Sequence, residues 1–323
     1  MAEMNDFTFR SWREGDDLEL LQIWPDAEST SASTFRASLA VDSDESPWRR
    51  TLVVEHQGIA IAAGTVYETS LHPQHLWAYI EVAPDHRRQG LGTELVRRLR
   101  ELAVSSPSGI TSLRSKVDVG SSAADFALAT GFSNVQRSRV VRVEAGSVPG
   151  VPLQQNDEGE LTQSIEDIAT GSVELTKKLW EFYQRSHQWD PPADTSLGRA
   201  NRIFLSDEAE AFGALVLRDD VMTAAARGQK GDIKAFAVSY RPLEQDIPGF
   251  ELSDDDATEV LLGYDFDYPQ VREAILQLLA PMVAQYPVTL EITDSMEDLT
   301  VMLNQLIRMG AASVMEDTLI VVG

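Results

Sequence analysis

The segment that most constrains this chain joins an apolar strand pattern to an amphipathic helix pattern. It reads Val82-Ala83-Pro84-Asp85-His86-Arg87-Arg88-Gln89-Gly90-Leu91-Gly92-Thr93. Glycines at two of these positions let the backbone approach a ligand closely, so that amide N–H groups at the helix start share one concavity with the positive end of the helix dipole. This pattern predicts a phosphate-binding loop, and a solvated loop with a helix cap is the alternative. Because it lacks Walker and Rossmann spacing, ATP and NAD are weaker interpretations.

The elements around the loop predict an α/β fold with a mixed sheet. Apolar alternation indicates strands and 3.6-residue periodicity indicates helices. In the first half we expect strands at 7–10, 51–55, 59–67, 76–82, 112–117 and 136–144, and helices at 17–24, 29–39, 92–104 and 122–130. In the second half we expect helices at 173–184, 196–205, 269–285 and 297–309, and strands at 211–218, 221–227, 258–266, 288–293 and 313–322. The recurring order predicts a duplicated architecture.

The length of 323 residues is about twice that of a common single domain, which favours two domains. Residues 146–164 concentrate Pro, Gly, Gln and acidic residues without an apolar period, as linkers do. The expected division is therefore a first domain at 1–145, a linker at 146–164 and a second domain at 165–323.

Charge and composition narrow the partners. Residues 1–150 carry 15 Lys and Arg against 20 Asp and Glu, whereas residues 151–323 carry 12 against 31. Such an acidic chain repels nucleic acid and anionic bilayers. An amine or other cationic partner suits this field, whereas a solvated acidic surface that aids solubility is the favoured explanation of the charge.

The absence of cysteine excludes disulfides, thiolate metal sites and cysteine nucleophiles, and it fits a reducing compartment. The five histidines, at 56, 72, 75, 86 and 187, form no metal-ligand spacing, so no metal is expected. No run of about 18 apolar residues and no signal-peptide pattern occurs, which predicts a cytoplasmic protein without membrane partners.

The loop resembles the R-x-x-G-x-G pyrophosphate loop of the GNAT superfamily, the Gcn5-related N-acetyltransferases. Arg87, Gly90 and Gly92 occupy the matching positions, and the resemblance extends over residues 7–144, including Gly131-Phe132 of the second motif. It implies two tandem GNAT domains and acetyl-CoA as cosubstrate. It also implies that the amides of residues 88–93 hold the pyrophosphate and that the strand ending at Val82 pairs with the pantetheine arm. The implied cofactor-binding residues are Val82, Arg87, Arg88, Gln89, Gly90, Leu91, Gly92 and Thr93.

In this family the amine attacks the thioester directly, so a group must accept a proton and another must protonate the thiolate. Tyr79 and Glu81 share one face of the strand beside the implied thioester. Glu81 is expected to be a proton acceptor or amine-binding carboxylate, with a salt-bridged or rim residue as the alternative. Relatives commonly carry a tyrosine where this chain has Ala127. Either Tyr79, Tyr67 or water substitutes, or the thiolate leaves unassisted.

The second copy departs from the family pattern at the corresponding loop, which has no arginine and no paired glycines. Asp265 and Asp267 would repel a pyrophosphate there, so we expect a degenerate copy that does not bind CoA. The second copy would form one side of the acceptor cleft and pack against the first copy. The aromatic run at 180–191 fits either an acceptor pocket or a helix anchor.

The resemblance thus implies an N-acetyltransferase that moves an acetyl group from acetyl-CoA to a primary amine of a small cationic acceptor. The alternative is a non-catalytic acyl-CoA sensor or partner-binding protein, which the missing tyrosine favours. A monomer or a homodimer is compatible with the sequence.

Overall fold

The computed structural model describes residues 4–26, 30–240 and 257–323, and its contacts divide the chain into two compact units. Unit 1 comprises Met1–Gln136, Trp189–Ala193 and Thr318–Gly323, and unit 2 comprises Arg137–Gln188 and Asp194–Asp317. The expected ranges 1–145 and 165–323 are continuous, whereas each of these units takes chain from both halves of the sequence. Unit 1 therefore includes two short segments of the second half.

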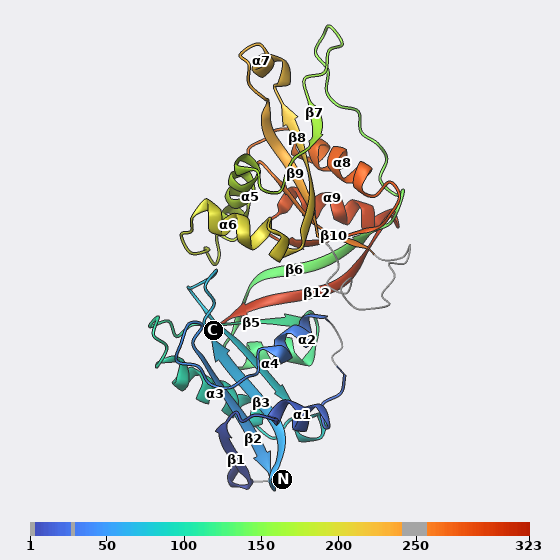
Figure 1. Ribbon diagram of the computed structural model, residues 1–323. Helices are drawn as coiled ribbons and strands as arrows, with labels where there is room; N and C mark the ends of the chain where they lie inside the picture. The colour runs from blue at the N-terminus through green and yellow to red at the C-terminus, as the bar shows by residue number, and fades with distance from the viewer. Residues whose placement is uncertain (1–3, 27–29, 241–256) are drawn as a thin grey trace. The chain divides into compact units, whose positions relative to one another are not determined.

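The sheet of unit 1 is antiparallel except at one strand pair (Figure 1). Its strands, in order, are β1 (Phe7–Ser11), β2 (Arg49–His56), β3 (Ile59–Tyr67), β4 (Leu76–Val82) and β5 (Leu113–Asp118). The parallel strands β4 and β5 pair only at Leu76 with Leu113 and at Trp77 with Arg114. Beyond those pairs the strands separate. The far edge of β5 pairs with Thr318–Val322, the last residues of β12 (Ala312–Val322).

Helices cover both faces of this sheet. They are α1 (Asp16–Leu21), α2 (Thr30–Ala37), α3 (Leu91–Ala103) and α4 (Ser122–Ala129), with 3-10 turns at Met4–Asp6 and Pro84–His86. Alternation along β4 sends Ala78 and Ile80 into the cores under α3, while Tyr79 packs with Leu20 of α1 on the opposite face. The two faces of β4 thus serve different neighbours at the point where the strands separate.

Unit 2 repeats this plan. Its strands, in order, are β6 (Ser133–Val143), β11 (Val288–Thr293), β10 (Thr258–Tyr264), β9 (Asp232–Tyr240), β8 (Ala211–Asp219) and β7 (Ser164–Asp167). Its helices are α5 (Val173–Ser186), α6 (Leu197–Phe204), α7 (Val221–Ala225), α8 (Val271–Met282) and α9 (Glu297–Arg308), with a 3-10 turn at Asp207–Ala209. The parallel pair β10–β11 again has only two paired positions. As in unit 1, the strand beside this pair comes from the other half of the sequence, because β6 pairs with β11.

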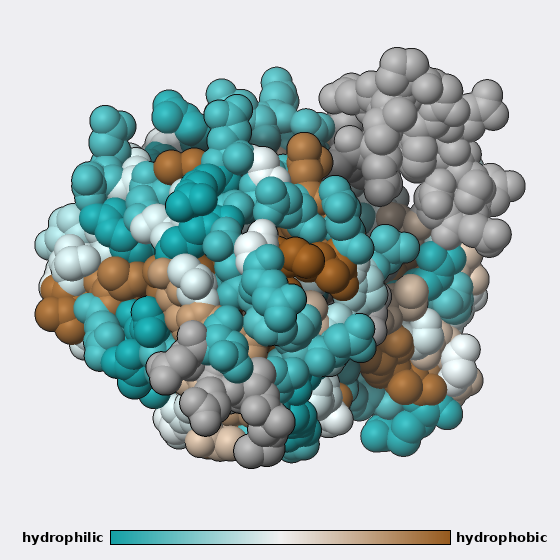
Figure 2. All heavy atoms as spheres, turned by 90° about the horizontal axis from the view of Figure 1, so that it is seen from below, coloured by the Kyte–Doolittle hydropathy of each residue, from teal (hydrophilic) through white to brown (hydrophobic). Residues whose placement is uncertain are grey.

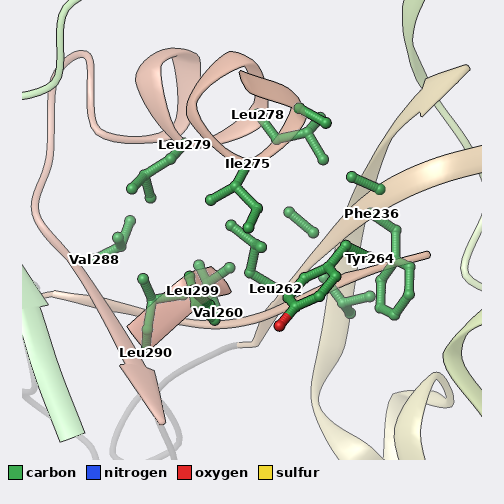
Figure 3. Packing of buried hydrophobic residues seen from close by; sticks show 14 of the residues in the cluster. Phe236, Val260, Leu262, Tyr264, Ile275, Leu278, Leu279, Val288, Leu290 and Leu299 are labelled. Carbon is green, nitrogen blue, oxygen red and sulfur yellow. The ribbon is translucent and has the colours of Figure 1, made fainter. Parts of the chain in front are cut away.

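The core of unit 2 fills the space beneath its parallel strands. Ile275, Leu278 and Leu279 of α8 point toward Val260 and Leu262 of β10 (Figure 3). Leu299 of α9 and the β11 side chains complete this packing. The apolar periodicity of 269–285 and 297–309 arises from this contact.

The mixed α/β fold and the tandem arrangement expected from the sequence are confirmed, but one hairpin arm was wrong. Residues 221–227 were expected as a strand, whereas Val221–Ala225 forms α7 and the partner of β8 is β9. Asp220 has a φ of 55° and begins α7, so the chain makes a helical turn before it returns as a strand. Inside the expected linker, Gln155 and Leu161 form an isolated bridge.

The part of the chain that the structure describes holds no helix long and apolar enough to cross a membrane. Figure 2 shows hydrophilic side chains over most of the face seen from below, with hydrophobic side chains in separate patches.

Candidate functional site

A cavity of about 730 Å³ opens in unit 1 where β4 and β5 separate. Its walls come from the ends of those two strands, the loop before α3, the first turn of α3, and residues of α2 and α4. Thr318 and Val321 of β12 also contribute. A site in this position uses the break in strand pairing, because the unpaired backbone of β4 and β5 can bond to a ligand.

The phosphate loop has the backbone that its glycines predicted. Gly90 has a φ of 86° and begins α3, which the left-handed conformation allows at little steric cost. The amides of Leu91, Gly92 and Thr93 open the helix and have no carbonyl one turn earlier to bond. Arg88 also has a positive φ of 61°, an uncommon backbone for a residue with a Cβ. Several N–H groups and the positive end of α3 therefore meet in one place, as a phosphate requires.

Packing gives Gly92 a second role. A Cβ added there would lie 3.1 Å from Cζ of Phe126, so the glycine allows α4 to approach the start of α3. Arg87 shapes the other side of the loop, because its Nε donates to the carbonyl of Val82 over 3.0 Å. One N–H group of the Arg87 guanidinium is thus bonded to the backbone of the protein.

Seven of the eight expected cofactor-binding residues line the cavity, and Gln89 does not. The Gln89 side chain instead donates to the Asp85 carbonyl over 3.3 Å. Sequence reasoning missed His86, which lines the cavity and lies edge-on to His56, with ring centroids 5.5 Å apart. The imidazole follows the apolar strand directly, but a lone histidine in a turn carries no distinguishing signal.

Glu81 of β4 also lines the cavity and forms an ion pair with Arg36 of α2. Arg36 donates from Nε to Oε2 over 2.8 Å and from Nη2 to Oε1 over 2.6 Å. Tyr79 donates its hydroxyl to Oε2 over 2.5 Å. Both side chains of the ion pair are largely buried. Since a carboxylate offers about four lone-pair positions, these three bonds leave one on Oε1 for a further donor.

The environment fixes the protonation of these groups. Burial, and secondly the hydrogen bond to Glu81, raise the pKa of Tyr79 far above its ordinary value, so its hydroxyl keeps the proton. The hydrogen bond to Glu81 likewise raises the pKa of Arg36. Tyr79 is therefore a hydrogen-bond donor toward Glu81 at any working pH. Arg36 lies in a segment expected to be helical, but its pairing with residue 81 had no signal in the sequence.

Ala127 lines the cavity on α4 and packs with Phe132 in the core. No hydroxyl stands at that position. Of the two tyrosines considered as substitutes, Tyr79 lines the cavity and Tyr67 does not. Lys116 and Asp118 of β5 line the opposite side of the gap from Tyr79 and Glu81.

In the corresponding loop of unit 2, a backbone hydrogen bond and an ion pair hold the two acidic residues. The Asp265 amide donates to the Lys234 carbonyl over 2.8 Å, and Asp267 forms a two-bond ion pair with Arg185 of α5. These residues line a separate cavity of about 370 Å³ whose remaining walls are largely aromatic. Carboxylates thus occupy the place where the first copy presents free amides.

The aromatic run 180–191 is divided between the two units. Trp180 stacks on Tyr183, and Phe182 packs edge-on against Phe236 in the core, so this part anchors α5 within unit 2. Trp189 and the residues after it belong to unit 1. Among the described residues, no group of three or more His, Cys, Asp or Glu side chains is placed to hold a metal ion.

Comparisons with known proteins agree with this geometry. Residues 9–132 match the sequence model of the Acetyltransferase (GNAT) family. The GCN5-related N-acetyltransferase from Sphaerobacter thermophilus is similar over 100% of this chain and 96% of its own, with a TM-score of 0.61 and 14% identity. A tandem GNAT protein from the clavulanic acid biosynthesis pathway is similar over 98% of both chains, with a TM-score of 0.56 and 14% identity. No curated protein matches the chain significantly.

Proposed function

We propose that this chain is an N-acetyltransferase using acetyl-CoA, since residues 9–132 match the model of the GNAT family and the chain as a whole has the tandem GNAT fold. The observation that carries the proposal is the loop in unit 1, where a left-handed Gly90 turns the first amides of α3 into the cavity. An anion at that place meets N–H groups and the helix dipole together. The pantetheine arm would extend along the edge of β4 that β5 leaves unpaired, between Trp77 and Val82.

The acceptor in this proposal is a primary amine, which attacks the thioester carbonyl from the face of β4 that carries Tyr79 and Glu81. Its nitrogen forms the new C–N bond while the C–S bond of the thioester breaks. Glu81 would receive the ammonium hydrogen bond or the departing proton through its remaining lone-pair position on Oε1. Arg36 and Tyr79 hold the carboxylate in one orientation for that role.

Neither Ala127 nor Tyr79 is placed to supply the proton for the thiolate. Ala127 occupies the position where relatives commonly have a tyrosine, and the Tyr79 hydroxyl already donates its hydrogen bond to Glu81. We propose that water protonates the thiolate or that the thiolate leaves unassisted, because a thiolate is a far weaker base than an alkoxide. Proton donation to sulfur would then contribute less to the rate than the carboxylate does.

We further propose that unit 2 binds no CoA, because Asp265 and Asp267 occupy the corresponding loop and would repel a pyrophosphate. The strongly acidic second half of the sequence fits a cationic acceptor. One CoA site per chain is the expected stoichiometry, and calorimetry measures it directly.

The test of the proposed function is release of free thiol from acetyl-CoA when an amine is added. The panel comprises spermidine, glucosamine, kanamycin and a short peptide with a free N-terminus, since the sequence and cavity do not choose among them. Thiol release with at least one amine, together with acetylated amine by mass spectrometry, is expected. Tight acetyl-CoA binding without turnover of any amine would instead support the acyl-CoA sensor, which the ion-paired state of Glu81 and the alanine at position 127 favour.

A further inference from the structure

A segment from the second half of the sequence, residues 189–193, belongs to unit 1. We call it the Asp190 segment. It is tied to the loop before β4, because the Ala193 amide donates to the Leu71 carbonyl over 2.8 Å and His72 Nδ1–H donates to the Asp190 carbonyl over 2.7 Å. The Asp190 side chain has no exposed surface. The chain therefore inserts an acidic residue into the interior of the unit that carries the candidate site.

Each oxygen of the Asp190 carboxylate accepts a hydrogen bond from a side chain of unit 1. Arg114 Nη1 donates to Oδ2, and His75 Nδ1–H donates to Oδ1 over 2.9 Å. Arg114 is itself only 4% exposed. Burying two opposite charges has a large desolvation cost, and removing one partner leaves the other charge uncompensated. The pair thus fixes the position of the Arg114 guanidinium tightly.

Arg114 stands where the two parallel strands separate. It faces Trp77 in the last β4–β5 pair, and its guanidinium lies 4.0 Å from the centroid of the Trp77 ring. Trp77 in turn packs against Phe35 of α2, with ring centroids 5.4 Å apart. Phe35 stacks on Tyr79 at 5.7 Å. A continuous row of rings therefore runs from Arg114 to Tyr79, whose hydroxyl bonds to Glu81.

We propose that Asp190 is a positioning residue for the amine acceptor. It holds Arg114 against the face of Trp77, and this contact fixes the row of Trp77, Phe35 and Tyr79 that orients the Glu81 carboxylate. A guanidinium over an indole face is attracted by the ring, most strongly where water is excluded, so the arrangement depends on the cation staying in place. The second half of the sequence thereby acts on acceptor binding through one inserted carboxylate. This inference rests on the proposed function.

The central variant is Asp190→Asn, which keeps the side-chain shape and removes the charge that holds Arg114. Asp194→Asn is the matched control, because Asp194 lies four residues later and is exposed. The protein is labelled with 5-fluorotryptophan, and Trp77→Phe identifies the Trp77 resonance in the fluorine NMR spectrum. We expect that resonance to shift in Asp190→Asn and to stay unchanged in Asp194→Asn.

Kinetics form the second arm, with the best amine of the panel as the probe. In Asp190→Asn the KM for the amine should rise about ten-fold, which corresponds to about 1.4 kcal/mol, while the Kd for acetyl-CoA stays within two-fold of wild type. A merely structural role would weaken both ligands or neither. We expect this split because none of Trp77, Phe35 and Tyr79 is among the residues that the proposal assigns to acetyl-CoA.

Asp190→Asn removes the carboxylate partner of a buried cation and can fail to fold, so the double variant Asp190→Asn with Arg114→Gln keeps the inference testable. It removes both charges, which restores stability, but it also removes the guanidinium from Trp77. We expect a folded protein with a raised amine KM. A wild-type KM in either folded variant, or an unmoved Trp77 resonance in Asp190→Asn, would overturn the inference. If wild type acetylates no amine, the proposed function fails, and the fluorine arm still decides whether Asp190 positions the row.

Discussion

Replacing Gly90 with glutamate places a side chain and a negative charge in the phosphate loop. The backbone there has a φ of 86°, which an L-residue adopts at a cost of roughly 1–2 kcal/mol. The new Cβ would lie 3.4 Å from the Met4 side chain, which is an ordinary contact, so packing adds little. The main effect on binding should therefore be electrostatic.

The expected magnitude follows from the charge and its distance from the diphosphate. Two unit charges 4 Å apart interact by about 1 kcal/mol in water and by about 4 kcal/mol near a protein surface. Because the loop is partly exposed, we expect a loss of binding free energy within this range, which is a roughly 5- to 1000-fold rise in the Kd for acetyl-CoA. Raising the salt concentration should reduce the difference in Kd between the Gly90→Glu protein and wild type, since the screening length is about 10 Å at 0.1 M and shorter at higher salt.

Calorimetry with acetyl-CoA measures this effect, and Gly90→Gln is the matched control. Glutamine has the same size and meets the same backbone strain, so the difference between the two variants isolates the charge. Circular dichroism confirms that both are folded. Equal affinities for acetyl-CoA in the Gly90→Glu and Gly90→Gln proteins would refute the assignment of this loop to the pyrophosphate.

Three further outcomes follow from the structure. Glu81→Gln should lower kcat by about 100-fold or more, as loss of a proton acceptor does, without changing the Kd for acetyl-CoA; an unchanged rate of thiol release would reduce Glu81 to an ion-pair residue. Gly263→Ala would place a Cβ 2.2 Å from Cζ of the buried Phe236 ring and should cost about 1–3 kcal/mol in urea unfolding, whereas Gly213→Ala, where a Cβ meets nothing within 4 Å, should cost almost nothing. Burial lowers the pKa of His72, so the folded protein binds fewer protons than the unfolded chain near the ordinary pKa of histidine. The free energy of unfolding should therefore fall as the pH drops below about 6.5. In His72→Asn the free energy of unfolding should depend less on pH over the same interval.

Local signals in the sequence explain why the backbone of the loop before α3 was predictable. Two glycines, a preceding apolar strand and a following amphipathic helix all lie within residues 76–103, and each acts on its own backbone. The structure accordingly places seven of the eight predicted residues on the cavity wall. The exception, Gln89, lies in the loop but turns to the Asp85 carbonyl, which residue spacing alone does not reveal.

Long-range partners had no comparable signal. Arg36 and Glu81 are 45 residues apart, and Arg114 and Asp190 are 76 apart, so their pairing depends on the assembled sheet. The missed strand β9 has a different cause. It follows α7 rather than a tight turn, so the hairpin expectation assigned the apolar residues after Asp220 to the wrong arm.

The second half of the sequence can influence the acceptor in two ways that differ in the distance over which they act. A diffuse acidic surface acts on a cationic acceptor only within about a screening length, whereas Asp190 acts through direct contacts inside unit 1. The same half also supplies Thr318–Val322, which pairs with β5 beside the cavity. Removing everything after residue 145 would therefore strip an edge from β5 and leave the Arg114 cation buried without its carboxylate. Loss of activity on truncation would then report an incomplete unit 1, so the contribution to the acceptor must be measured by substitution at Asp190 in the full chain.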